Sequence, residues 1–368
     1  MSAGYTKGSK TAARPYRPTG RYGNGGGGTY GEPQDDGDRW ERRMRAWQVQ
    51  ELGEPAKVLK LVEVDDPTPA AGQLLVKPLA AAVNFPDALM CRGLYQVKPP
   101  LPFTIGQEMC GEVLEVGEGV TGFKPGDRVL GGAPGAFADL TLTGAIAAFP
   151  APASLTDAEA SALFIGYQTG WFALHRRANL QPGETLLVHA AAGGVGSAAV
   201  QLGKAAGARV IGVVGGEAKA DFARQLGADL VIDRKKEDVI AAVKAATDGK
   251  GVDVVYDPVG GDAYQQSTKV IAFEGRILVI GFASGTIPTP GINHALIKNY
   301  SIVGLHWGLY TQRAPQLVAE CHAELTKLAD AGAIKPLITE QIPFTEVPDA
   351  VQRLADGKTV GRLAVVPA

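Results

Sequence analysis

The chain has 368 residues, 45% of them hydrophobic and 20% charged, with a formal net charge of −2 at pH 7. This length allows two domains with large cores, the composition is typical of a globular protein, and no apolar run reaches the ~20 residues that a membrane span needs. Only Cys91, Cys110 and Cys321 occur, without a C-x-x-C spacing, which argues against a disulfide framework or a structural zinc site and favours a reducing, cytoplasmic location.

Residues 1–43 are rich in Gly, Pro, Ser, Thr and charged residues, with four glycines in a row at 25–28. Such a segment buries too little apolar surface to offset its ordering entropy, so we predict a disordered Gly-rich tail. Its Arg-Tyr-Gly run at 21–23 is compatible with weak RNA contacts, but an inert tail, or an extension before a start at Met44, explains the same composition. The mildly acidic remainder of the chain does not indicate nucleic-acid binding.

Between Met44 and about residue 168, short strand-like runs alternate with Gly and Pro turns, which predicts a mostly antiparallel β domain. The expected strands are 59–64, 74–83, 111–116, 127–130 and 136–142.

From about residue 169 strands and helices alternate, which predicts a doubly wound parallel sheet of the Rossmann type. The expected strands are 185–189, 209–214, 230–233, 252–256, 275–281 and 300–305. After His306 we expect a helix over 313–331, a strand, a helix over 347–355 and a last strand over 362–366. This returning segment can complete the first domain. The prediction is therefore an α/β protein with a β domain from 44–168 and 306–368, and a Rossmann domain from 169–305.

The apolar run that ends at His189 leads into a glycine turn, Ala190 to Gly196, and then into a helical pattern. A strand, a tight turn and a helix start can bind a dinucleotide pyrophosphate, because backbone N–H groups and the positive helix end face the anion. The spacing is not a strict G-x-G-x-x-G, but a second strand follows at the distance of a β-α-β unit. An ordinary strand–helix turn is the alternative. We predict a bound nucleotide cofactor, held by Ala192, Gly193, Gly194, Val195 and Gly196.

The residues after the second strand favour NADPH over NADH. In Rossmann sites an acidic residue about twenty positions past the glycine turn binds the ribose 2′-OH. Here Gly215 and Gly216 follow the strand, which leaves room for a 2′-phosphate, and Lys219 offers it a counter-charge. Two alternatives remain: Glu217 reaches the ribose instead, or Lys219 is an ordinary solvated helix residue.

Five segments carry a family resemblance: Val-Asn-Phe-Pro-Asp at 83–87, Arg-Gly-Leu-Tyr at 92–95, Pro-Phe-Thr-Ile-Gly-Gln-Glu at 102–108, the turn at 190–196, and Asp-Pro-Val-Gly-Gly at 257–261. Over residues 44–366 the chain resembles the zinc-free quinone oxidoreductase (zeta-crystallin-like) branch of the medium-chain dehydrogenase/reductase superfamily. The resemblance implies a GroES-like β domain beside the Rossmann domain. It also implies a homodimer formed through the Rossmann edge strand near Tyr300 to Leu305.

The resemblance further places four residues where the family contacts the nicotinamide ring, although turn geometry alone explains each of them. They are Thr169, Gly260, Gly281 and Phe282.

The departures from the family pattern concern zinc. Zinc alcohol dehydrogenases, by resemblance, ligate the metal through a Gly-His-Glu motif, which here reads Gly106-Gln107-Glu108. An amide is a poor zinc ligand compared with imidazole or thiolate, and the family's lobe with four structural cysteines is missing. We therefore predict no metal site.

A reductase without zinc lacks the Lewis acid that stabilises a simple alkoxide, so a conjugated acceptor is favoured: a quinone or an α,β-unsaturated carbonyl compound. Hydride addition then spreads charge onto an oxygen that hydrogen-bond donors can hold. Asn84 and Tyr95 are the predicted catalytic donors, with Tyr95, by resemblance, a proton donor or positioning group. The alternatives are that Tyr95 packs the loop while water supplies the proton, and that Asn84 only forms a turn.

Two other functions stay open at this point. One is an enoyl-thioester reductase, which needs a channel for the pantetheine arm. The other, of a different class, is a non-catalytic NADPH-binding protein whose tail binds RNA. The natural acceptor and the oligomer size are not encoded in any motif recognised here.

Overall fold

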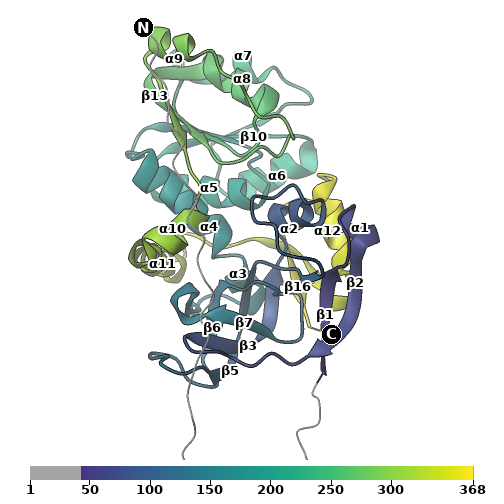
Figure 1. The fold of residues 1–368 in the computed structure, drawn as a ribbon. Coiled ribbons are helices and arrows are strands. Elements are labelled where there is room, and N and C mark those ends of the chain that lie inside the picture. Colours follow the sequence, from purple (N-terminus) through teal and green to yellow (C-terminus); the bar gives the residue numbers. More distant parts are fainter. Residues whose placement is uncertain (1–42, 368) are drawn as a thin grey trace, which may run out of the picture. The chain divides into compact units, whose positions relative to one another are not determined.

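The computed structural model describes residues 43–367 (Figure 1). The predicted disordered tail, its RNA contacts and the extension before Met44 lie outside the described residues, except that Arg43 already belongs to the first strand. No helix within this described range is long and apolar enough to cross a membrane.

The first part of the chain folds into two β-sheets. A three-stranded sheet has the order β2-β1-β4, with both pairings of β1 antiparallel. A seven-stranded sheet has the order β15-β16-β3-β5-β6-β8, and β7 pairs with β3 beside this path. The bounds are β1 (Arg43–Val49), α1 (Pro55–Val58), β2 (Leu59–Asp65), β3 (Gln73–Ala82), α2 (Phe85–Cys91), β4 (Phe103–Thr104), β5 (Glu108–Val116), β6 (Arg128–Gly132), β7 (Thr141–Gly144), β8 (Ala148–Pro150) and α3 (Asp157–Ser161).

The predicted strand over 136–142 is wrong for residues 136–140, because only Thr141 onward belongs to β7. The N–H of Phe137 donates to Ile105 and its carbonyl accepts from Trp47, while the N–H of Asp139 donates to Arg45. These residues therefore form hydrogen bonds to different segments of the β region and do not extend β7.

The parallel sheet has the order β11-β10-β9-β12-β13-β14, and every pairing in it is parallel. Buried residues of α5 and α6 pack on one face, and those of α7 and α8 pack on the other, as a doubly wound fold requires. The bounds are α4 (Ile165–Trp171), the π-helix η2 (Phe172–Arg177), β9 (Thr185–His189), α5 (Gly194–Ala205), β10 (Arg209–Val214), α6 (Glu217–Gln225), β11 (Leu230–Asp233), α7 (Val239–Ala246), β12 (Val252–Asp257), α8 (Gly261–Val270), β13 (Ile271–Val279), α9 (Ile292–Lys298) and β14 (Ser301–Gly304).

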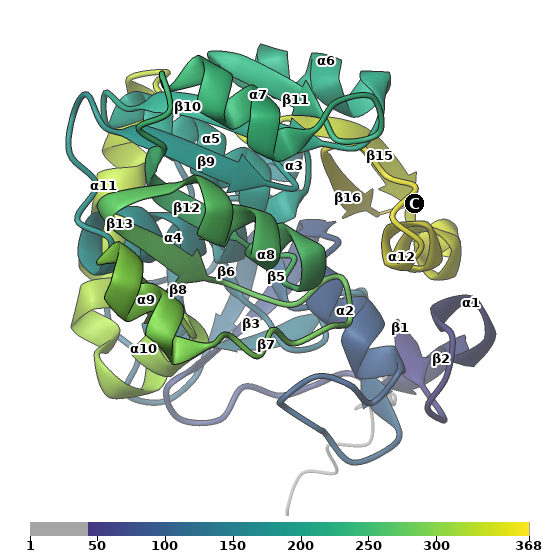
Figure 2. The same ribbon diagram turned by 90° about the horizontal axis from the view of Figure 1, so that it is seen from above.

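The C-terminal segment returns to the first sheet. Its elements are α10 (Gly308–Arg313), α11 (Pro315–Asp330), β15 (Ile338–Pro343), α12 (Val347–Ala355) and β16 (Arg362–Val366). β16 pairs antiparallel with β3 and parallel with β15, while α12 lies against α1 and α2 (Figure 2). The predicted helix over 313–331 is shorter, because a break at Ala314 separates α10 from α11, which begins at a proline.

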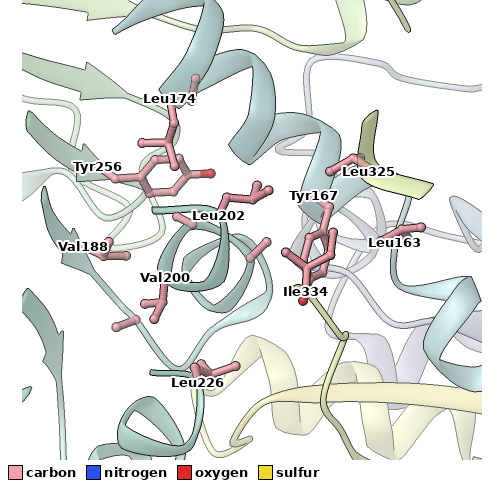
Figure 3. Packing of buried hydrophobic residues seen from close by; sticks show 14 of the residues in the cluster. Leu163, Tyr167, Leu174, Val188, Val200, Leu202, Leu226, Tyr256, Leu325 and Ile334 are labelled. Atoms are coloured by element: carbon pink, nitrogen blue, oxygen red, sulfur yellow. The ribbon is translucent and has the colours of Figure 1, made fainter. Parts of the chain in front are cut away.

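One buried cluster joins elements from both regions (Figure 3). Leu163 and Tyr167 from around α4 meet Leu202 of α5 and Leu325 of α11, and the Tyr167 hydroxyl donates to Gln201 at 2.7 Å. Burying each such side chain contributes about 1.5–3 kcal/mol. Because α4, α5 and α11 share this core, side-chain packing does not separate two domains at the predicted boundaries, which lie between residues 168 and 169 and between residues 305 and 306.

Candidate functional site

The turn between β9 and α5 has the form of an anion cradle. Gly193 caps α5 without a side-chain hydrogen bond, and residues 193–195 are only partly buried. A Cβ atom at Gly196 would collide with the carbonyl of Ala190, so this position accepts only glycine at the observed spacing of strand and helix. The five residues predicted from sequence, 192–196, therefore lie in one turn, where free N–H groups and the positive end of a 12-residue helix can meet a phosphate.

A basic cluster lies beside this turn, at the carboxyl ends of β10 and β11. The Arg234 guanidinium is 3.3 Å from where a Cβ of Gly215 would be, and the Lys235 ammonium is 4.0 Å from the same point of Gly216. Lys219 belongs to the cluster as well: its pKa is lowered by burial and by the charges of Lys235 and Arg234, and its ammonium donates to the carbonyl of Gly357 at 2.7 Å. Sequence analysis missed Arg234 and Lys235, although parallel strands β10 and β11 end at the same sheet edge.

The acidic residues near the cluster are partly occupied, and Asp233 Oδ2 is buried without a partner among the described residues. Asp233 Oδ1 accepts the N–H groups of Gly216 and Lys235, at 2.8 and 3.1 Å. Glu217 accepts hydrogen bonds from Lys236 and Arg224, which lower its pKa. The alternative in which Glu217 binds a ribose would require these ion pairs to open.

Gly260, Gly281 and Phe282 come together at the carboxyl ends of β12 and β13. The N–H of Gly260 donates to Asp257 Oδ1 at 3.0 Å, and the Phe282 ring is 2.9 Å from where a Cβ of Gly260 would be. Thr169, from α4, is buried on a different element. The structure thus groups three of the four residues predicted to contact the nicotinamide.

Asn84, one of the two predicted catalytic residues, belongs to a buried network of hydrogen bonds around an ion pair. Glu108 Oε1 accepts from Arg362 at 2.6 Å and from Asn84 at 2.9 Å, and Oε2 accepts the N–H of Ile165 at 2.7 Å. Burial raises the pKa of Glu108, while Arg362 and the N–H groups of Ile165 and Asn84 oppose that rise. Arg362 also lies 2.5 Å from where a Cβ of Gly194 would be, so the network reaches the glycine turn.

The amide of Asn84 is fully used within this network. Its two N–H groups donate to Glu108 and to the carbonyl of Ala82, at 2.9 and 3.1 Å, and its oxygen accepts from Arg362 at 3.0 Å. Direct donation from Asn84 to a substrate stays a prediction, but here it has no unused hydrogen for that role.

Tyr95 lies in the loop after α2 and is half-buried. Burial, and to a smaller extent the charge of Asp87, raise its pKa. Asp87 is itself fully buried, accepts the backbone N–H of Asn84 at 2.7 Å, and has its pKa raised to about 7, mainly by burial. Asp87 is thus hydrogen-bonded to Asn84, while a shared site for Tyr95 and Asn84 stays a prediction.

Gln107 takes the place of the family's zinc-binding histidine, and its Nε2 donates to Met90 Sδ at 2.9 Å. Burial raises the pKa of the nearby Cys91 thiol to about 12 and that of Cys110 to about 12, so neither readily supplies a thiolate. No group of three His, Cys, Asp or Glu side chains within residues 43–367 is arranged to hold a metal ion.

A cavity of about 540 Å³ opens elsewhere, in the β region. Arg45, Lys77, Asp139 and Phe344 line it together with small apolar residues, and none of the predicted site residues is among them. It is not the site assembled above.

Two family models match the chain. The family model of the alcohol dehydrogenase GroES-like domain matches residues 70–179, and that of the zinc-binding dehydrogenase domain matches residues 194–323. A quinone oxidoreductase-like protein 2 homolog from Nematostella vectensis is 38% identical over 335 residues, which cover 89% of this chain and 91% of that protein.

Two solved structures are similar throughout. Escherichia coli quinone oxidoreductase in complex with NADPH has a TM-score of 0.81 at 33% identity, covering 88% of this chain and all of that one. The CurK enoyl reductase has a TM-score of 0.81 at 27% identity, covering 89% of this chain and all of that one. The GroES-like and Rossmann architecture predicted from the sequence is confirmed. The chain belongs to the zinc-free quinone oxidoreductase branch of the medium-chain dehydrogenase/reductase superfamily.

Proposed function

We propose that this protein is an NADPH-dependent oxidoreductase that transfers a hydride to a quinone or an α,β-unsaturated carbonyl compound without a catalytic zinc ion. The observation that carries the proposal is the position of the glycine turn, residues 192–196, beside the basic cluster of Lys219, Arg234 and Lys235. A helix amino end fits a pyrophosphate, and clustered cations fit a 2′-phosphate.

The surroundings favour NADPH over NADH. The Glu217 carboxylate accepts from Lys236 and Arg224 and would have to leave them to accept a ribose 2′-OH, whereas Asp233 uses only Oδ1, and its buried Oδ2 has no partner among residues 43–367. The similar quinone oxidoreductase of Escherichia coli was solved with NADPH bound. Bound NADPH would supply the hydride, and the chain must orient the cofactor and stabilise the charge that forms on the acceptor.

The donors in the site suit a conjugated acceptor. Without an imidazole or thiolate metal site, an alkoxide has no Lewis acid to stabilise it, whereas an enolate or a hydroquinone anion carries a delocalised charge that hydrogen bonds can hold. Tyr95 provides a half-buried phenol in the loop after α2. We assign Tyr95 as the proton donor to an enolate and Asn84 as a residue that positions Glu108 and Arg362.

A second candidate reaction is the reduction of an enoyl thioester. The similarity to an enoyl reductase, CurK, favours it, and the chemistry of hydride addition is the same as for an enone. Reduction of an enoyl thioester would differ from that of an enone in that the site must also bind the pantetheine arm of the substrate.

Steady-state oxidation of NADPH against quinones, enones and enoyl thioesters tests the proposal. We expect turnover with at least one class and a kcat/KM for NADPH well above that for NADH. Saturable NADPH binding without turnover of any acceptor would support a cofactor-binding protein instead.

We further propose a homodimer through β14. This strand ends the parallel sheet, and exposed apolar residues gather on it and on the neighbouring α9 and β13: Ile302, Ile292, Leu296, Ile297 and Phe273. An open edge strand beside an apolar surface favours pairing with a second copy. Sedimentation should give twice the chain mass, and Ile302→Lys should shift it toward the monomer.

Cytoplasmic location stays a prediction from the cysteine content.

A further inference from the structure

Gln107 differs from Asn84 in how its amide is used. It lies immediately before β5, and its backbone carbonyl accepts the N–H of Ala133 at 2.9 Å. Its side chain is partly exposed, whereas Asn84 is only 4% exposed. The Gln107 side chain is therefore less enclosed than that of Asn84, whose amide belongs to a closed network.

The hydrogen bonds of Gln107 are weak or missing. Its only recorded side-chain partner among residues 43–367 is the thioether of Met90, and thioether sulfur is a weak acceptor. A ligand oxygen can replace that sulfur at little cost. Asn84 would have to leave Glu108 or Arg362, and an unsatisfied buried polar group costs about 1–3 kcal/mol.

Gln107 is also close to Asn84 and to α2. It directly precedes Glu108, whose Oε1 accepts from Asn84 at 2.9 Å, and its own amide donates to Met90 of α2, the helix that begins after Asn84. Tyr95 lies in the loop that follows α2. The Gln107 amide thus contacts the helix that connects Asn84 to the loop of Tyr95.

We propose that the side-chain amide of Gln107, and not that of Asn84, donates the hydrogen bond that holds the oxygen of the acceptor during reduction. The inference rests on the proposed function. With an enone, the hydride that NADPH would supply, leaving NADP⁺, forms a C–H bond at the β-carbon, and the π electrons move to the carbonyl oxygen, which Gln107 holds. The carbonyl double bond then re-forms as the α-carbon takes a proton from the Tyr95 phenol, which regains one from solvent. With a quinone, the anion formed by hydride addition takes its proton from water.

Gln107→Met tests the proposal, because Met keeps much of the shape of Gln but has no N–H. We expect kcat/KM to fall about 10- to 100-fold for quinones and enones alike, less than for a fully enclosed oxyanion donor, because Gln107 is partly exposed. Binding of 4-nitrophenolate, a stable oxyanion, should weaken about tenfold. The Kd for NADPH and the Tm of the free protein should not change. Gln316→Met, at an exposed position of α11, is the matched control.

Gln107→Glu adds a readout that a packing role would not give. A protonated Glu can donate to the oxygen and an ionised one repels it, so activity relative to the native protein should fall as pH rises through the pKa of the new carboxyl group. Unchanged kcat/KM and 4-nitrophenolate binding in Gln107→Met, with no pH effect in Gln107→Glu, would overturn the inference. A fall in Tm with loss of NADPH binding would assign Gln107 to the fold. Failure of the proposed function would instead appear as an inactive native protein.

Discussion

Arg362 and Glu108, 254 positions apart in the chain, form a buried ion pair with a nitrogen–oxygen distance of 2.6 Å. Arg362 begins the last strand, β16, and Glu108 begins β5. The guanidinium also contacts Asn84 and lies against Gly194 of the glycine turn. The pair therefore connects the end of the chain, the predicted catalytic segment and the cofactor turn.

Arg362→Met should lower the free energy of unfolding by about 3–5 kcal/mol, because it leaves the Glu108 carboxylate buried without its counter-charge. Denaturant unfolding measures this loss. Arg224→Met is the matched control, because Arg224 pairs with Glu217 and Asp221 on the surface and should contribute no more than about 1 kcal/mol. Similar losses of unfolding free energy in both variants would show that the buried pair contributes no more to stability than the surface pairs.

Gly196→Ala should abolish cofactor binding, because the added methyl group collides with the Ala190 carbonyl and forces α5 away from β9. NADPH fluorescence titration measures the effect. Gly144→Ala is the control: there the new Cβ would meet only Ile146, at an ordinary 3.8 Å. Normal NADPH affinity in Gly196→Ala would mean that the turn does not hold the pyrophosphate.

Arg234→Ala and Lys219→Ala should each weaken NADPH binding about 10- to 100-fold, because each removes a charge-assisted contact to the 2′-phosphate worth roughly 1.5–3 kcal/mol. NADH lacks this phosphate, so its affinity should hardly change. Isothermal titration with both cofactors distinguishes the cases. An equal loss for NADH and NADPH would assign these residues to the fold.

Tyr95→Phe should reduce enone turnover about 10²–10⁴-fold, the usual worth of a positioned general acid, and affect quinone turnover much less. An enolate must be protonated on carbon, whereas water can protonate a hydroquinone anion. Parallel kcat/KM measurements on one enone and one quinone, with NADPH affinity as the control, test this. Full enone activity would leave Tyr95 as a packing residue.

The sequence predicted the local elements better than the contacts between them. The bounds of β10, β11, α12 and β16 agree with the predicted ones, because apolar periodicity and flanking glycines mark them within a few residues. By contrast, the segment around Phe137 has strand-like residues but takes its hydrogen bonds from Ile105 and Trp47, which no local pattern reveals.

In the candidate site, too, the local features were predicted better than the contacts between distant segments. The glycine turn is local and was predicted as a unit, whereas the partners of Asn84 come from Glu108 and Arg362, which are distant in sequence. Arg234 and Lys235 follow β11, a strand that lies one β-α unit beyond the strand after the glycine turn, so the local pattern around that turn does not include them. The rule that parallel strands end at one edge would have brought β11 and its basic residues into the argument.

The most direct test of a zinc-free reductase is NADPH oxidation with a quinone, measured before and after prolonged chelation, with metal analysis of the same sample. Gln107 supplies an amide where zinc enzymes of the superfamily have an imidazole, and the thiols of Cys91 and Cys110 are buried and protonated. We expect less than stoichiometric zinc and an unchanged kcat after chelation. One zinc ion per chain, lost together with activity and restored with it, would contradict the account.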